Sequence, residues 1–307
     1  MTANRAVYGD TIWELAKTNE KIVVVDSDCI GPLNYQKFVE DFPDRFFECG
    51  IAEQDMVSTA AGLASCGLTA FCASFAVFVS MRALDQVRNQ VCYNNLNVKM
   101  IGTHCGIETG YDGATHQSIE DLAIMRAIPN LVVLAPSTPV MTEKLTRIMA
   151  EAYGPFYMRF GRNQNEEIYT PEDSFPIGGS KRIYDGDAVT VMTHGSLLPI
   201  AKKAVEELRR EGVNVRLSDM YSLKPLDTEE IEAAAKETAF ILTIEDHSII
   251  GGLGGAVCEY TAEHCPCRVV RMGMNDSFGR AGTTADLYRL YGLTAEEIVR
   301  KIRALIP

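Results

Sequence analysis

The chain has 307 residues, of which 47% are hydrophobic and 23% charged, a soluble mixture long enough for two domains. Its formal net charge of −12 argues against a surface for nucleic acid or an anionic membrane, because either needs clustered Lys and Arg. No apolar run reaches the ~20 residues that span a bilayer. The nine cysteines show no paired framework and no charged-then-apolar leader is present, so we expect a cytoplasmic protein.

The first half of the chain alternates predicted helices with predicted strands. Hydrophobic patterns predict helices at 2–19, 53–66, 75–93, 119–126 and 139–152, and strands at 21–26, 45–48, 68–74, 98–102, 131–135 and 156–159. The β-branched run at 22–25 is typical of a strand buried on both faces. This alternation predicts a doubly wound parallel sheet, in which ligands bind at the carboxyl ends of the strands.

Residues 163–179, rich in Asn, Glu, Pro and Gly, are predicted to be a linker between domains at 1–170 and 180–307. The second domain is again α/β, with strands predicted at 189–193, 213–218, 240–245 and 268–272, and helices at 199–211, after the glycine cluster 251–255, and twice near the end. That cluster lacks the dinucleotide fingerprint and is interpreted as a tight turn before a helix.

One segment, 46–55, places a carboxylate in the first turn of a predicted helix. Glu53 follows Cys49-Gly50, and small residues then dominate the helix, which suits close packing at a subunit or domain interface. Acidic residues are common in a first turn because of the helix dipole, so Glu53 alone does not indicate a function.

The segment 50–54, Gly-Ile-Ala-Glu-Gln, resembles the pyrimidine-binding segment of thiamine-diphosphate enzymes of the transketolase family. The resemblance continues through 73–78, 102–106 and 112–117 and covers nearly the whole chain, which matches the second part of a full-length transketolase. It implies a doubly wound pyrimidine-binding domain, followed by a smaller α/β transketolase C-terminal domain.

The resemblance implies that Glu53 hydrogen-bonds the aminopyrimidine of thiamine diphosphate and so helps to form the ylid of the cofactor. Phe75 and Phe78, three residues apart, can line one wall against a planar ring. Met81 lies where transketolases often carry a tyrosine, and its polarizable side chain can fill that position.

The resemblance also implies a sugar phosphate site. Asp112 and His116 would contact sugar hydroxyls, and His104, at a strand end, would reach toward the substrate phosphate. Arg162 and Arg5 match phosphate-binding arginines of the family, whose planar guanidinium binds phosphate oxygens in pairs.

Two departures from the family pattern concern the substrate and the diphosphate. Pro32 stands about where a phosphate-binding serine is often found, which leaves central pentose phosphate metabolism and a specialised sugar pathway both open. The Gly-Asp-Gly motif that holds the diphosphate through Mg²⁺ is also missing, and 185–187 has the reverse order. We therefore expect a separate N-terminal subunit to bind Mg²⁺ and the diphosphate. Two copies of each chain would form a heterotetramer, and we also expect this chain to associate with itself.

The leading hypothesis is the C-terminal subunit of a split transketolase, which moves a two-carbon ketol unit from a ketose phosphate to an aldose or aldose phosphate. One alternative is a deoxyxylulose-phosphate synthase or a 2-oxo acid dehydrogenase β chain, although Thr103-His104 favours transketolase over the synthase, which usually has Asp-Arg. The other is a silent regulatory paralogue, whose expected mark would be loss of Glu53. Residues 245–247 resemble a family segment, and the second domain is assigned to assembly.

Overall fold

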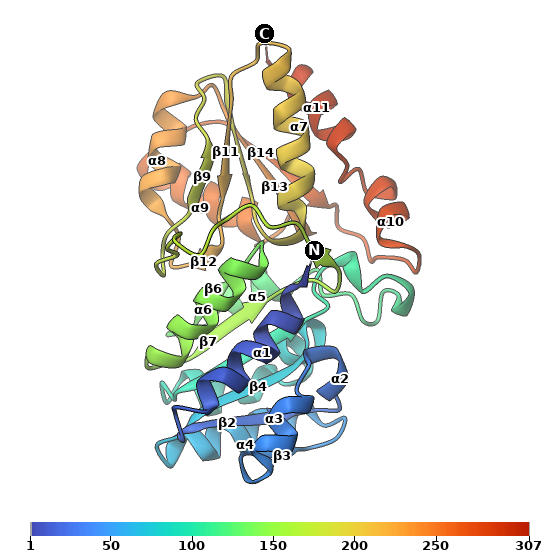
Figure 1. The fold of residues 1–307 in the computed structure, drawn as a ribbon. Coiled ribbons are helices and arrows are strands. Elements are labelled where there is room, and N and C mark those ends of the chain that lie inside the picture. The colour runs from blue at the N-terminus through green and yellow to red at the C-terminus, as the bar shows by residue number, and fades with distance from the viewer. Residues whose placement is uncertain (1, 307) are drawn as a thin grey trace.

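The computed structural model describes residues 2–306, which form two α/β units, one above the other in Figure 1. The first unit has a seven-stranded sheet in the order β12-β6-β7-β5-β4-β2-β3. Its strands are β2 (Ile22–Asp26), β3 (Phe46–Glu48), β4 (Thr69–Phe75), β5 (Val98–Thr103), β6 (Val132–Leu134), β7 (Phe156–Arg159) and β12 (Ser222–Lys224). All pairs are parallel except β12 with β6, so the predicted doubly wound sheet is confirmed, with an added antiparallel edge.

Helices cover both faces of this sheet because the central strands are apolar on both sides. One face carries α1 (Asn4–Ala16), α2 (Ile30–Leu33), α3 (Gln36–Asp41) and α6 (Pro139–Glu151). The short η1 (Pro43–Arg45) follows α3 in the chain. The other face carries α4 (Glu53–Ser65), η2 (Phe78–Arg82), η3 (Gln86–Cys92) and α5 (Asp121–Ala127). The helical segments thus occupy the two layers that a parallel sheet requires.

Two predicted helices differ from the structure. The helix predicted at 2–19 begins only at Asn4, after a short strand β1 (Thr2–Ala3) that pairs with β8 (Gln164–Asn165). The helix predicted at 75–93 contains the two π-helical segments η2 and η3 rather than one regular α-helix. A π-turn accommodates an extra residue, and such turns are frequent beside functional sites.

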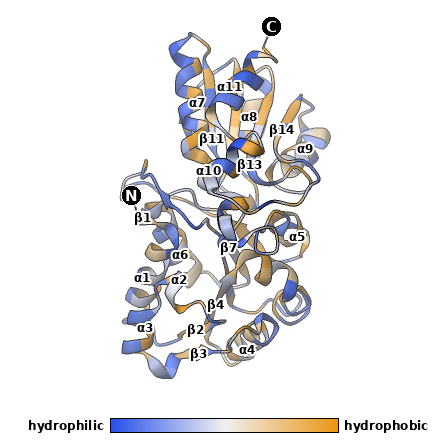
Figure 2. Cartoon of the chain, turned by 90° about the vertical axis from the view of Figure 1, so that its right-hand side faces the viewer, coloured by the Kyte–Doolittle hydropathy of each residue, from blue (hydrophilic) through white to orange (hydrophobic). Residues whose placement is uncertain are grey.

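The second unit has a five-stranded sheet in the order β14-β13-β10-β11-β9. Its strands are β9 (Lys181–Tyr184), β10 (Val189–Thr193), β11 (Val215–Asp219), β13 (Ile241–Ser248) and β14 (Val269–Met274), parallel except for β9. On one face lie η5 (Gly195–Leu197), α7 (Leu198–Arg210), α10 (Thr284–Leu290) and α11 (Ala295–Arg303), and on the other α8 (Thr228–Glu237) and α9 (Leu253–His264). Figure 2 shows hydrophilic stretches of α3 and α11 at the periphery.

The two units share a continuous interior. A single apolar cluster includes side chains of α4 and α5 in the first unit together with those of α8 and α9 in the second. The elements β9, β12 and α8 were not predicted from the sequence, and β12 crosses from the second half of the chain to extend the first sheet. In the part of the chain that the structure describes, no helix has both the length and the apolar character needed to cross a bilayer.

Candidate active site

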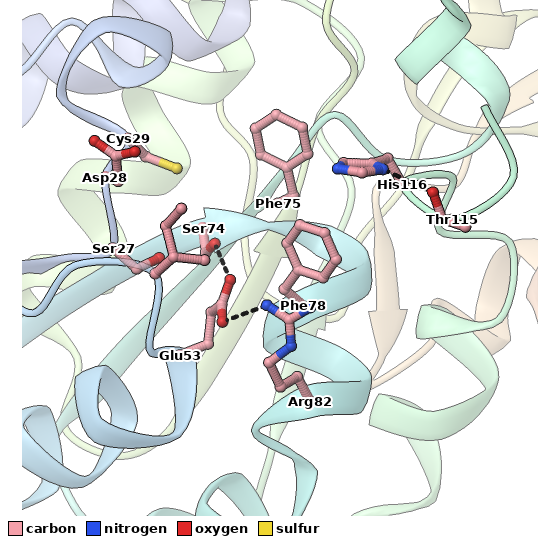
Figure 3. A pocket seen from close by; sticks show the side chains of 11 residues that line it. Ser27, Asp28, Cys29, Glu53, Ser74, Phe75, Phe78, Arg82, Thr115 and His116 are labelled. Atoms are coloured by element: carbon pink, nitrogen blue, oxygen red, sulfur yellow. Dashed lines mark hydrogen bonds and ion pairs between the residues drawn. The ribbon is translucent and has the colours of Figure 1, made fainter. Parts of the chain in front are cut away.

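A cavity of about 340 Å³ opens at the carboxyl ends of β2 and β4 (Figure 3). This is the sheet edge at which ligands bind in parallel α/β folds. The loop after β2, the start of α4, the end of β4, η2 and the 115–116 segment contribute its lining, which consists of Ser27, Asp28, Cys29, Ile51, Glu53, Ser74, Phe75, Phe78, Arg82, Thr115 and His116.

Glu53 is the first residue of α4, and its carboxylate is almost fully buried, with 1% of the residue exposed. One carboxylate oxygen accepts a hydrogen bond from Arg82 Nη1 at 2.8 Å, and the other accepts from Ser74 Oγ at 3.4 Å. Figure 3 shows Glu53 between these two side chains. A buried charge needs such partners, since an unpaired carboxylate in the interior is costly.

A flat aromatic wall lies beside this carboxylate. The rings of Phe75 and Phe78 are stacked, with centroids 5.9 Å apart and planes at 14°. The imidazole of His104 stacks on Phe75 at 4.2 Å and 6°, and His116 meets Phe78 edge-on at 5.2 Å. A wall of parallel rings next to a hydrogen-bonding carboxylate suits a planar heterocycle that carries a polar ring nitrogen.

His104 occupies an unusual backbone position at the end of β5, with φ of +55°. Its Nδ1 lies 3.1 Å from Thr103 Oγ1. Burial, and after it the charges of the nearby Arg162 and Arg5 guanidinium groups, lower the pKa of His104 to about 3. The imidazole is therefore neutral near pH 7 and acts as a hydrogen-bonding group and a stacking surface.

Two arginines meet beside His104. Arg5 Nε donates to the carbonyl oxygen of Arg162 at 3.3 Å, and Arg5 Nη1 donates to the carbonyl oxygen of Pro32 at 2.6 Å. Burial, and then the charge of Arg162, lower the pKa of Arg5. Arg162 Nη1 lies 3.6 Å from an Asp112 carboxylate oxygen. Two guanidinium groups and one carboxylate leave this cluster with excess positive charge, which favours an anionic ligand group.

The carboxylates of Asp26 and Glu48, which do not line the cavity themselves, hold the loops that form it. The buried Asp26 accepts a hydrogen bond from the Cys29 backbone N–H at 2.7 Å, and burial raises its pKa to about 7, with the Glu48 carboxylate adding to the rise. Glu48 accepts from the backbone N–H groups of Asp28 at 3.0 Å and of Gly50 at 2.7 Å. Glu48 thus ties the loop after β2 to the loop that leads into α4.

The structure brings most of the predicted site residues together. Glu53, Phe75, Phe78 and His116 line the cavity, while His104, Asp112, Arg162 and Arg5 form the adjoining polar group. Met81 is 38% exposed and is not part of the lining, where its neighbour Arg82 is found instead.

Sequence reasoning missed several side chains that line the cavity, namely Ser27, Asp28, Cys29, Ser74 and Arg82. A signal existed for Arg82, because it follows Phe78 by four residues and so can lie over the same ring, at 4.3 Å from its centroid. Asp28 has φ of +58°, a conformation that the sequence does not reveal.

Within residues 2–306, no group of three or more His, Cys, Asp or Glu side chains is arranged to hold a metal ion. The nine cysteines are free thiols, including Cys265 and Cys267 near His264.

Two family models and several known proteins match most of the chain. Residues 1–166 match a family model described as transketolase, pyrimidine binding domain, and residues 178–298 match transketolase, C-terminal domain. A transketolase C-terminal section of Methanocaldococcus jannaschii is 45% identical over 97% of this chain and 94% of its own length. A 6-deoxy-6-sulfo-D-fructose transketolase subunit of Clostridium sp. (strain MSTE9) is 37% identical over 96% of this chain and 92% of its own.

A solved structure described as a split gene transketolase, inactive β4 tetramer, superposes with a TM-score of 0.92 at 41% identity. The match covers 99% of this chain and 98% of that one.

Proposed function

This chain belongs to the transketolase family, and we propose that it is the C-terminal subunit of a split transketolase. In this proposal it works with a separate N-terminal subunit to transfer a two-carbon ketol unit from a ketose phosphate to an aldose or aldose phosphate. The observation that carries the proposal is the buried Glu53 carboxylate beside the stacked rings of Phe75 and Phe78. Full-length similarity to relatives named as sections or subunits supports the two-chain organisation.

The family depends on thiamine diphosphate, and the residues of the cavity fit its pyrimidine ring. When bound, this cofactor supplies a carbon nucleophile and an electron sink, which let a two-carbon unit leave one sugar and join another. Glu53 would hold a proton at a pyrimidine ring nitrogen, while Phe75 and Phe78 would orient the ring and exclude water from it. Met81, the remaining predicted cofactor contact, lies outside the cavity lining, so we assign no ring contact to it.

We assign the adjoining polar group, together with His116, to binding of the sugar substrate. His116, which meets the aromatic wall edge-on, and Asp112 would bind substrate hydroxyls. Arg162 and Arg5 would bind the distal anionic group of the substrate, and the neutral His104 would hydrogen-bond to it. The named substrate of the Clostridium relative carries a sulfonate, an anion that guanidinium groups also bind.

The diphosphate and Mg²⁺ are assigned to the partner subunit, because the Gly-Asp-Gly motif is absent from this sequence. We further propose a heterotetramer of two copies of each chain, located in the cytoplasm. The related split-gene chain is described as an inactive tetramer of one subunit, which supports both self-association and the need for a partner. The boundaries at 1–170 and 180–307 are part of the same proposal.

The first experiment is a pull-down of this chain from its native lysate, with mass spectrometry of the proteins that co-elute in stoichiometric amounts. We expect a partner that carries Gly-Asp-Gly followed by Asn, and an eluate that transfers ketol units in a panel of phosphorylated and sulfonated ketoses. Recovery of this chain alone, together with tight Mg²⁺-dependent thiamine diphosphate binding by the isolated chain, would refute the two-subunit proposal.

The catalytic assignment is tested in the reconstituted complex with Glu53→Gln. We expect ketol transfer to fall by about 10²-fold or more, because proton transfer by a positioned group contributes about this much. Glu40→Gln, the same substitution at an exposed position on α3, is the matched control and should leave the rate unchanged. Unchanged transfer by the Glu53 variant would favour a regulatory role for the chain.

A further inference from the structure

The loop that carries the predicted sugar-binding residues is packed against the second α/β unit. This segment, residues 104–117, is named the 104–117 loop. The carboxylate of Asp246, near the carboxyl end of β13, accepts a hydrogen bond from the backbone N–H of Ile107 at 2.9 Å, and both residues are buried. The two residues are 139 positions apart in the chain, so only tertiary packing brings them together.

The fit between Asp246 and the 104–117 loop is tight. Gly106 has φ of +63°, and a Cβ built on it would lie 2.1 Å from an Asp246 carboxylate oxygen. No side chain fits in that space, and L-residues rarely adopt this backbone conformation. The glycine therefore lets the backbone approach the carboxylate closely enough for the Ile107 bond.

Further contacts join the 104–117 loop to the second unit. Ser196 Oγ of the second unit donates to one Glu108 carboxylate oxygen at 2.8 Å, and Asn163 Nδ2, from the segment between the units, donates to the other at 3.2 Å. At the far end of the loop, Gln117 Nε2 donates to the carbonyl oxygen of Arg280 at 2.9 Å. The loop is thus held near its start, at Ile107 and Glu108, and at its last residue, Gln117, by polar contacts from outside the first sheet.

The 104–117 loop is tied internally by Thr109 Oγ1, which donates to the carbonyl oxygens of His104 at 2.7 Å and of His116 at 3.2 Å, and by backbone turns within 110–117. It contains only the short 3₁₀ segment η4 (Ile107–Asp112), in which Gly110 departs from helical geometry, and Gly106, Gly110 and Gly113 all have positive φ. Glycine-rich backbone loses much conformational entropy when it is ordered, so contacts with other segments help to hold the loop in place. The contacts with the second unit therefore act together with these internal bonds to fix the position from which His104 and His116 face the aromatic wall.

We propose that Asp246 of the C-terminal domain is a positioning residue, which holds the 104–117 loop so that its side chains meet the sugar in productive geometry. The inference rests on the proposed function for the identity of the ligand, and it gives the C-terminal domain a role beyond assembly. Asp246 acts through the Ile107 N–H and does not itself line the cavity. Small displacements of substrate-positioning groups reduce reaction rates strongly, so a distant anchor of this kind affects kcat/KM for the substrate.

The experiment compares Asp246→Ala with Asp246→Asn. Asparagine keeps a side-chain oxygen that can accept from Ile107, and its amide can donate to the Tyr288 hydroxyl, now bonded to Asp246 at 3.3 Å. Alanine keeps neither bond. Hydrogen exchange of the isolated chain is measured first, because the Ile107 amide is the bonded group and reports on the contact directly.

In the Ala variant we expect exchange within 104–117 to rise by about tenfold or more, while exchange in α4 stays at the wild-type rate. In the reconstituted enzyme the same variant should raise the KM for the ketose about tenfold, with a smaller change in kcat. The Asn variant should stay within about twofold of wild type in both measurements. Wild-type exchange at Ile107 in the Ala variant, or an equal rise in α4, would overturn the proposal.

A second variant keeps the test decisive if Asp246→Ala does not fold. Gly106→Ala introduces a methyl group on the loop side of the same contact and should produce the same local rise in exchange and in KM. A complete lack of ketol transfer by the wild-type complex would contradict the proposed function, whereas the exchange data from the isolated chain would still decide the role of Asp246.

Discussion

Arg82 Nη1 donates a hydrogen bond of 2.8 Å to the Glu53 carboxylate, although the two residues lie 29 positions apart, on η2 and at the start of α4. The two partners differ in exposure, since 44% of the Arg82 side chain but only 2% of the Glu53 side chain reaches solvent. The guanidinium also lies over the Phe78 ring, 4.3 Å from its centroid. Arg82 therefore connects the buried carboxylate of the site to its aromatic wall.

The first prediction concerns this ion pair. Arg82→Met keeps the apolar stem over Phe78 and removes the charge, so we expect a loss of about 1 kcal/mol in the free energy of unfolding, because solvent screens the half-exposed pair. Urea denaturation of the isolated chain measures this loss. Arg88→Met, an exposed arginine on η3, is the control and should change stability by less than about 0.5 kcal/mol. Equal losses in the two variants would show that the pair adds no stability.

The second prediction concerns the aromatic wall. Phe78→Leu keeps an apolar side chain but removes the stacked ring, so thiamine diphosphate should bind the reconstituted complex about tenfold more weakly. Isothermal titration calorimetry measures the Kd. Phe42→Leu removes a ring that packs on Phe38, in the core on the opposite face of the sheet, and should leave the Kd unchanged. Parallel weakening in both variants would indicate a general loss of packing.

The third prediction follows from the lowered pKa of His104. Because the folded-state pKa is about 3 and the ordinary value is 6.5, the unfolded chain binds a proton between these pH values while the folded chain does not. His104 therefore contributes a loss of stability as the pH falls from about 6.5 toward 3. His104→Asn suits the positive φ and removes this titration. Over that pH range the variant should therefore lose on the order of 5 kcal/mol less stability than the wild type.

Denaturant unfolding of wild type and His104→Asn at a series of pH values tests this difference. The comparison between the two proteins is the measured quantity, since buried carboxyl groups such as Asp26 and Asp219, whose pKa values are raised to about 7, titrate in both. Parallel stability curves from pH 7 to pH 4 would contradict the prediction.

The fourth prediction concerns the start of α9. The buried carboxylate of Glu245 accepts from the backbone N–H groups of Leu253 at 2.7 Å and Gly254 at 2.9 Å. Glu245→Ala leaves both groups buried without this acceptor and should lower the free energy of unfolding by about 2–3 kcal/mol. Glu263→Ala, at an exposed position near the end of α9, is the matched control and should have almost no effect in thermal or chemical denaturation.

Much of the fold could be predicted because most of its strands are short runs of apolar residues, such as the β-branched run at 22–25. The run at 22–25 became the buried centre of β2, and 156–159 became β7 without any change of boundary. The strands β9 and β12 were missed because they are short and partly polar, so they depend on a neighbouring strand for pairing. The π-helical geometry of η2 and η3 was missed because it is defined by backbone hydrogen bonds from i to i+5, which a residue pattern does not record.

The sequence by itself determined the family, the alternation of helices and strands, and the positions of Glu53, Phe75 and Phe78, because local residue patterns and short motifs carry this information. Only the tertiary structure decided that Arg82 pairs with Glu53, that Met81 lies outside the cavity lining, and that Asp246 bonds to Ile107. These contacts join residues 29 and 139 positions apart, or depend on the direction in which one turn of helix faces. Local residue preferences do not encode contacts between residues so far apart in the chain, since such contacts arise when two sheets and their covering helices pack together.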